Sequence, residues 1–165
     1  MGIAQMMLPE LKHEAANTRK ILERLKQAED KFEWRPHQKS YTMGQLASHI
    51  ANLTTWITMT INSDELDLAS SPRRQPLTGF LEVLEVFEKN LDEATKALEG
   101  ADDSLLMKKW TLRKGDHVIL ELPKAAVIRS MVFNHVVHHR GQLTVYLRLN
   151  DLAVPGMYGP SADEQ

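Results

Sequence analysis

The fold and the chemistry of this chain are indicated by one stretch near its C-terminal end, Asn134-His135-Val136-Val137-His138-His139-Arg140-Gly141-Gln142-Leu143. It lies within a longer segment, Pro123 to Leu149, where apolar residues recur three and four positions apart, as is typical of an amphipathic helix. Residues four apart stack on one helix face, so His135 and His139 present two imidazoles side by side. His138 points about 100° away from His139 and is expected at the surface or beside a ligand. Two imidazoles can hold a divalent transition metal, but the site needs a third ligand.

A candidate third ligand lies on an earlier helix. The sequence Thr42-Met43-Gly44-Gln45 has the form of a capping box and predicts a helix that runs to about Asn62. His49 lies on the apolar face of this helix, together with Leu46, Leu53 and Trp56. A histidine on such a face is often a core residue bonded to a backbone carbonyl. If the helices pack in a bundle, however, His49 can converge with His135 and His139 into a three-imidazole site with open positions, as in catalytic metal centres.

The rest of the chain predicts two more amphipathic helices. One runs from Leu8 to about Glu29, with Pro9 in its first turn, and the other from Thr78 to Leu98, with Gly100 as a cap. Residues 30–41 and 63–76 contain prolines and polar side chains and are expected to form a connector and a long crossover. The acidic residues of the crossover, Asp64, Glu65 and Asp67, are expected to face water.

Two segments lack helical periodicity. Residues 101–122 place β-prone runs on both sides of Lys114-Gly115-Asp116, which predicts a small hairpin or loop before the last helix. The tail, 150–165, contains helix breakers and is expected to lie across the surface. In the last helix, Arg140 is interpreted as a surface or interface charge and Gly141 as a place of close backbone approach. These elements predict an all-α four-helix bundle with a small insertion, built as one domain, 1–165.

Composition excludes several classes of function. The chain has 165 residues, 42% of them hydrophobic, and 20 basic against 22 acidic residues. This balance gives no electrostatic footprint for nucleic acid or an anionic membrane, and no apolar run approaches the roughly 20 residues of a membrane span. The absence of cysteine removes disulfides, thiolate ligands and a cysteine nucleophile. The N-terminus does not resemble a signal peptide, so a cytoplasmic location is expected.

Four segments together resemble the DinB-like (DinB/YfiT) family, namely Arg35-Pro36, Gly44 to Ala51, Asn134 to Leu143 and Tyr158 to Glu164. Their order and spacing match over nearly the whole chain. The resemblance implies an up-down-down-up four-helix bundle with a long crossover. It also implies a divalent metal, often nickel or zinc, held by His49, His135 and His139. Family members are often dimeric, so a homodimer is expected.

The resemblance also suggests a chemistry, because characterised relatives transfer or use low-molecular-weight thiols. The leading hypothesis is therefore a metal-dependent enzyme of the thiol S-transferase type that acts on a small molecule. Asn52 and Trp56 lie beyond His49 on its face, and Gln142 lies three residues after His139, so these three are candidates to line the pocket or to orient a ligand imidazole. A metalloprotease is not indicated, because the chain has no His-Glu-x-x-His motif.

Two alternatives remain open. The chain can be a non-catalytic helical dimerisation module with a structural or vestigial metal site. A closed structural site would require a fourth protein ligand, such as His13, His37 or His117. The other alternative is a hydrolase that uses a metal-bound hydroxide, in which case simple esters would react without any thiol.

Overall fold

The structure is a computed structural model that describes residues 2–71 and 75–164. Residues 72–74, part of the predicted crossover, lie outside the described residues. The helices are α1 (Ile3–Arg24), α2 (Met43–Leu53), α3 (Thr55–Asn62), α4 (Phe80–Glu99), α5 (Asp103–Leu106), α6 (Lys124–Ile128) and α7 (Asn134–Arg148). Short 3-10 turns span Leu25–Gln27 and Glu29–Lys31, and a π-helical turn at Arg129–Phe133 joins α6 to α7. The strands are β1 (Glu65–Asp67), β2 (Lys109–Lys114) and β3 (His117–Pro123).

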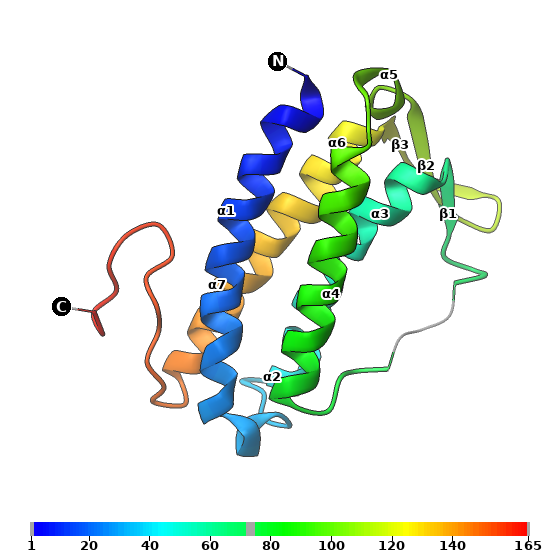
Figure 1. Cartoon of the computed structure of the whole chain (residues 1–165). Helices are drawn as coiled ribbons and strands as arrows, with labels where there is room; N and C mark the ends of the chain where they lie inside the picture. The colour runs from blue at the N-terminus through cyan, green and yellow to red at the C-terminus, as the bar shows by residue number, and fades with distance from the viewer. Residues whose placement is uncertain (1, 72–74, 165) are drawn as a thin grey trace.

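The long helical segments pack side by side, and each contacts two of the others. In Figure 1, α1 runs downward from the N-terminus, α2 with α3 and then α4 run upward, and α6 with α7 runs downward again. α1 contacts both α4 and α7, while α2 contacts α4 and α7 from the other side. The crossover between α3 and α4 must therefore return along the length of the molecule, which explains its length. None of the described helices combines the length and the hydropathy that a membrane span requires.

The fold is mostly helical, as predicted, and carries a small three-stranded sheet, of which the all-α prediction included only a hairpin or loop insertion. Strands β2 and β3 form the antiparallel hairpin expected within 101–122, and Gly115 takes a left-handed backbone conformation at its turn, with φ 59°. β1 was not predicted. It pairs in parallel with β2, so that the sheet order is β1-β2-β3.

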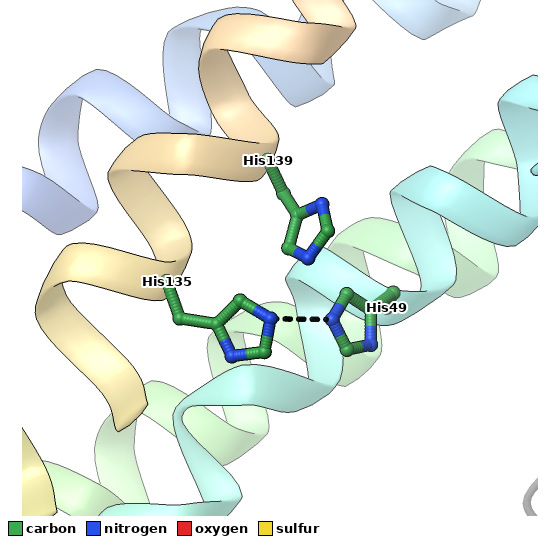
Figure 2. A group of neighbouring side chains, drawn as sticks. All are labelled: His49, His135 and His139. Atoms are coloured by element: carbon green, nitrogen blue, oxygen red, sulfur yellow. Dashed lines mark hydrogen bonds between the residues drawn. The ribbon is translucent and has the colours of Figure 1, made fainter. Parts of the chain in front are cut away.

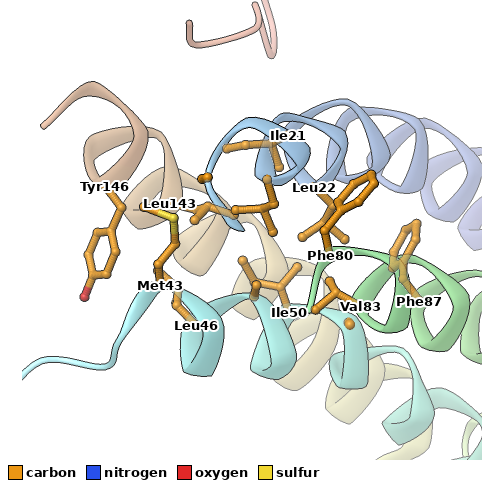
Figure 3. Packing of buried hydrophobic residues seen from close by; sticks show 14 of the residues in the cluster. Ile21, Leu22, Met43, Leu46, Ile50, Phe80, Val83, Phe87, Leu143 and Tyr146 are labelled. Atoms are coloured by element: carbon orange, nitrogen blue, oxygen red, sulfur yellow. The ribbon is translucent and has the colours of Figure 1, made fainter. Parts of the chain in front are cut away.

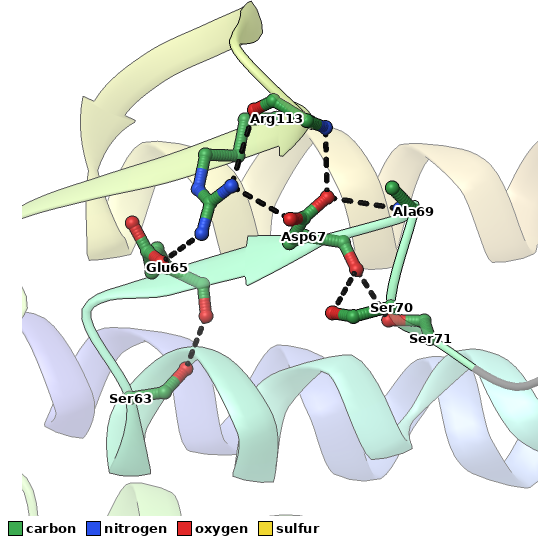
Figure 4. A network of polar contacts seen from close by, with 8 residues as sticks. Ser63, Glu65, Asp67, Ala69, Ser70, Ser71 and Arg113 are labelled. Carbon is green, nitrogen blue, oxygen red and sulfur yellow. Dashed lines mark hydrogen bonds and ion pairs between the residues drawn. The ribbon is translucent and has the colours of Figure 1, made fainter.

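Ion pairs and hydrogen bonds to β2 and to the turn after it hold the unpredicted strand β1 in place (Figure 4). Arg113 of β2 donates to Asp67 at 2.6 Å and to Glu65 at 2.7 Å, and Asp67 also accepts from the backbone N–H groups of Gly115 and Ala69. The expectation that these carboxylates face water is therefore wrong for Asp67, whose side chain is 17% exposed, whereas Glu65 is exposed and also pairs with Arg113. The strand has only three residues and its partner Arg113 lies far along the chain, so the local signal for it is limited to a short alternation of acidic residues and leucines.

Helix ends differ from the predictions in two places. α1 begins at Ile3 and ends at Arg24, so Pro9 lies inside the helix rather than in its first turn. The position is exposed, where water can replace the missing backbone hydrogen bond. The second predicted helix begins at the expected capping box, in which Gln45 N–H donates to Thr42 Oγ1 at 3.2 Å and Thr42 N–H to Gln45 Oε1 at 2.9 Å. It is interrupted at Thr54, which separates α2 from α3.

Two large apolar clusters fill the molecule, and the candidate site lies where they meet. Figure 3 shows the first cluster, to which α1, α2, α4 and α7 contribute Ile21, Leu22, Met43, Leu46, Ile50, Phe80, Val83, Phe87, Leu143 and Tyr146. The second cluster includes Leu53 of α2 and Val136 of α7. Along α2, His49 lies between Leu46 and Ile50 of the first cluster, and Leu53 of the second cluster follows one turn later. Along α7, His139 lies between Val136 of the second cluster and Leu143 of the first.

Candidate metal centre

Three histidines from two helices converge at this junction (Figure 2). His49 comes from α2, and His135 and His139 come from successive turns of α7. One potential ligand atom from each lies within 4.8 Å of the others, and this is the one such cluster found among the described residues. The Nε2 atoms of His49 and His135 are 3.3 Å apart. Two nitrogens bound tetrahedrally to zinc at about 2.0–2.1 Å would be separated by about 3.3 Å, so this spacing fits a metal.

The outer nitrogens of two rings are fixed by oxygen acceptors. His139 Nδ1 lies 2.7 Å from Gln142 Oε1, and His135 Nδ1 lies 3.3 Å from the carbonyl oxygen of Met131. Because both oxygens can only accept, each Nδ1 must carry the proton and donate it. Each Nε2 is then unprotonated and directed into the cluster, which is the form that binds a metal.

The π-helical turn contributes to this orientation. Within it, Asn134 N–H donates to the carbonyl oxygen of Arg129, five residues earlier rather than four. A π turn inserts an additional residue and rotates everything after it by about 100° relative to an unbroken α-helix. The turn therefore sets the direction in which His135 and His139 leave α7. The apolar periodicity of the sequence predicted one regular helix here and gave no sign of the insertion.

Burial lowers the pKa of all three imidazoles. For His49 the pKa falls from its usual 6.5 to about 4, first because desolvation disfavours the imidazolium and then because of repulsion from His139 and His135. The pKa values of His135 and His139 are also lowered, mainly by desolvation. At neutral pH the cluster is therefore a set of three uncharged imidazoles, as metal binding requires.

These shifts predict a pH-dependent stability for the metal-free protein. Between about pH 6.5 and pH 4 the unfolded chain holds a proton on His49 that the folded chain does not, so the free energy of unfolding rises with pH across this window and falls on acidification. Urea unfolding in the presence of a chelator at pH 7 and pH 5 measures the loss. The decrease in the free energy of unfolding between pH 7 and pH 5 should be smaller in His49→Gln than in wild type. It should be unchanged in His37→Gln, a control at an exposed histidine. An equal loss in His49→Gln and wild type would contradict this account.

Gln142 is predicted to act through His139. Gln142→Ala removes the acceptor that fixes the ring, so the affinity for zinc should fall by about 10- to 100-fold, the usual effect of losing such a partner. Competition with a chromophoric chelator measures it. Gln142→Glu keeps an acceptor and should retain most of the affinity. Equal affinities for wild type and Gln142→Ala would show that Gln142 does not position the ring.

The structure places the other sequence-predicted residues as follows. His138 is exposed and lies beside His139, with ring centroids 4.8 Å apart. His13, His37 and His117 are exposed and do not belong to the cluster.

Two interpretations of residues next to His139 are wrong. Arg140 is buried, and its guanidinium binds Glu14, Thr18 and Tyr158. The sequence around Arg140 did not indicate this, because its partners come from α1 and the tail. A Cβ on Gly141 would meet no atom within 4 Å, so no neighbouring backbone approaches closely.

A cavity of about 770 Å³ adjoins the cluster at His49. It is lined by Tyr41, Gln45, Ser48, His49, Asn52, Leu53, Thr55, Trp56, Met59, Leu66, Leu68, Ser71, Gln75 and Pro76. The predicted pocket residues Asn52 and Trp56 are among them, whereas Gln142 is not and instead contacts His139. Leu66 and Leu68 were missed because the crossover was interpreted as solvated. Their alternation with Glu65 and Asp67 is a strand-like signal that could have identified them.

Comparisons with known proteins agree with this architecture. A model of the DinB family matches residues 2–165. The chain is 26% identical over 159 residues to the uncharacterised protein YrdA of Bacillus subtilis, covering 92% of this chain and 85% of that protein. A DinB-like protein of Bacillus cereus superposes with a TM-score of 0.72 at 22% identity, over 92% of this chain and 95% of that one. The DinB-like protein YjoA of B. subtilis superposes with a TM-score of 0.70 at 15% identity, over 97% and 99%. The two structural matches show a shared fold.

Proposed function

The chain belongs to the DinB family, and from this premise we propose that it is a divalent-metal-dependent enzyme of the type that transfers low-molecular-weight thiols. Nickel and zinc both suit the donor set, because imidazole nitrogen binds both well. The observation that carries the proposal is the cluster of His49, His135 and His139, with one ligand atom from each within 4.8 Å.

The number of ligands supports a catalytic rather than a structural metal. A structural zinc site is closed by four protein ligands, whereas a catalytic site has three and leaves a position for substrate. Among the described residues the cluster contains three histidines and no carboxylate. His49 also lines the cavity, so a molecule in the cavity reaches the edge of the cluster.

The lack of a carboxylate favours a thiol over water as the reacting group. A divalent metal held by three neutral imidazoles keeps its positive charge and lowers the pKa of a thiol or water bound to it. The cluster and the described lining of the cavity contain no Asp or Glu that could act as a general base. A thiol, with a usual pKa of about 8.5, depends less on such a base than water does.

The test is a comparison of two reactions on the zinc- or nickel-loaded protein. With 2-mercaptoethanol and 1-chloro-2,4-dinitrobenzene, a sulfur–carbon bond forms, chloride leaves and the thiol proton passes to solvent. We expect a rate above the uncatalysed reaction that is lost in His49→Ala. Hydrolysis of 4-nitrophenyl acetate without any thiol would instead favour the hydrolase. Metal binding with neither activity, together with unfolding when the metal is removed, would favour a structural site.

A further inference from the structure

The cavity beside His49 changes character along its length. Near His49 it is bounded by Tyr41 and Gln45, which can form hydrogen bonds. Trp56 lies seven residues further along the α2–α3 segment, which corresponds to about 10 Å of helix. There the wall consists of Trp56, Met59 and Leu66, with Trp56 packed against Trp110 at a ring-centroid distance of 6.1 Å. This far end is apolar, and none of the described residues that line the cavity is Asp, Glu, Lys or Arg.

The serine and threonine hydroxyl groups along the cavity do not offset this character, because they bond to the protein. Ser48 Oγ donates to the carbonyl oxygen of Gly44 at 2.6 Å and accepts from Leu77 N–H at 2.8 Å. Thr55 Oγ1 donates to the carbonyl oxygen of Asn52 at 2.8 Å. Ser71 Oγ donates to the carbonyl oxygen of Asp67, also at 2.8 Å. Hydroxyl protons engaged in this way are not available to a ligand.

One wall of the far end depends on β1. Successive side chains of a strand point to opposite faces. Leu66 and Leu68 line the cavity, while Glu65 and Asp67, which alternate with them, pair with Arg113. The ion pairs of Arg113 with Glu65 and Asp67 (Figure 4) thus hold the charged side chains of β1 on one face. Leu66 lies on the opposite face, toward the cavity.

We propose that the far end of this cavity, formed by Trp56, Met59 and Leu66, binds an uncharged apolar group of about the size of an aromatic ring on the substrate. Arg113 is a positioning residue for this specificity, because it holds β1 against the cavity. The inference rests on the proposed function and specifies its substrate class. A charged group at this end would lose water without gaining a partner of opposite charge, and its binding is therefore disfavoured.

The probes are three thiols added to the zinc-loaded protein, with dissociation constants measured by calorimetry. 4-Phenylbutane-1-thiol carries an uncharged ring at the reach of Trp56, 4-(4-sulfanylbutyl)benzoate adds a carboxylate to that ring, and 2-mercaptoethanol lacks the ring. The neutral aryl thiol should bind on the order of 100-fold more tightly than its carboxylate, which would be buried without a partner. Equal affinities for the neutral and the carboxylate probe, or no binding of any probe, would overturn the inference.

Variants distinguish a change in substrate preference from a general loss of folded protein. Met59→Lys places a cation at the far end and should reverse the preference in favour of the carboxylate probe, an effect that unfolding cannot produce. Met107→Lys, on an exposed methionine outside the cavity, should leave the preference unchanged. Arg113→Met should lower the affinity for 4-phenylbutane-1-thiol about tenfold, which is typical of a lost pocket contact. Its affinity for 2-mercaptoethanol should not change. Arg19→Met, which breaks an exposed pair with Glu88, is its control.

Zinc content is measured on every sample before the thiols are added. One zinc per chain without the predicted preference would overturn this inference alone. Failure of wild type to hold zinc would overturn the proposed function. Retention of the preference in Met59→Lys would show that the ring does not lie at the far end.

Discussion

Replacement of His139 by alanine is expected to abolish stable metal binding while the helical fold persists. The ring is one of three converging imidazoles, and its Nδ1 is already bonded to Gln142, so its Nε2 faces the cluster. Losing a direct ligand should cost more than the 10- to 100-fold that follows loss of a ligand's hydrogen-bond partner. Zinc per chain after dialysis, with circular dichroism on the same sample, measures both parts of the expectation.

His138→Ala is the matched control, because His138 is the next residue, is exposed and lies outside the cluster. It should keep one zinc per chain. The fold should survive in His139→Ala because the helices pack through two apolar clusters to which no histidine contributes. Equal zinc retention in His139→Ala and His138→Ala would contradict the assignment of the ligands. Unfolding of His139→Ala under conditions where the metal-free wild type stays folded would contradict the independence of the fold.

Replacement of Arg140 by methionine is expected to destabilise the protein by about 3–5 kcal/mol, the cost of leaving a buried charge without its partner. The Arg140 side chain is 1% exposed and that of Glu14 is 12% exposed, with a nitrogen–oxygen distance of 2.5 Å. The same guanidinium donates to the carbonyl oxygen of Glu14, to Thr18 Oγ1 and to Tyr158 Oη. It therefore fastens α7 to α1 and to the C-terminal tail at one point.

Urea unfolding of metal-free protein measures this loss. Arg148→Met is the control, because its pair with Asp163 lies at the surface, where ion pairs contribute about 0–1 kcal/mol. The double variant Arg140→Met with Glu14→Met should recover part of the stability, since both charges are then replaced by apolar side chains. A loss below about 1 kcal/mol in Arg140→Met would show that the buried pair does not hold the tail and the helices together.

Local patterns predicted most of what positions the histidines. The capping box at Thr42 set the start of α2 correctly, and the four-residue spacing of His135 and His139 placed both rings on one side of α7. The family resemblance of the four quoted segments is confirmed by the match over residues 2–165. These features were accessible because each depends on residues close together in the sequence.

Features that depend on distant partners were not predicted. β1 exists because Arg113 and the backbone of β2 pair with it, and Arg140 is buried because Glu14 and Tyr158 meet it. The π-helical turn before His135 leaves no signature in apolar spacing. As a result, the sequence indicated the candidate ligands and the lining residues Asn52 and Trp56, but not the part of the cavity wall formed by Leu66 and Leu68.

X-ray absorption spectroscopy of the zinc- or nickel-loaded protein tests the central claim most directly, because the fine structure counts imidazole ligands. Three histidine nitrogens are predicted for wild type, at about 2.0–2.1 Å for zinc. If His49→Ala retains some metal, its spectrum should show one imidazole ligand fewer than that of wild type. A metal surrounded by oxygen ligands alone, or a spectrum identical in wild type and His49→Ala, would contradict the three-histidine site on which the proposed function rests.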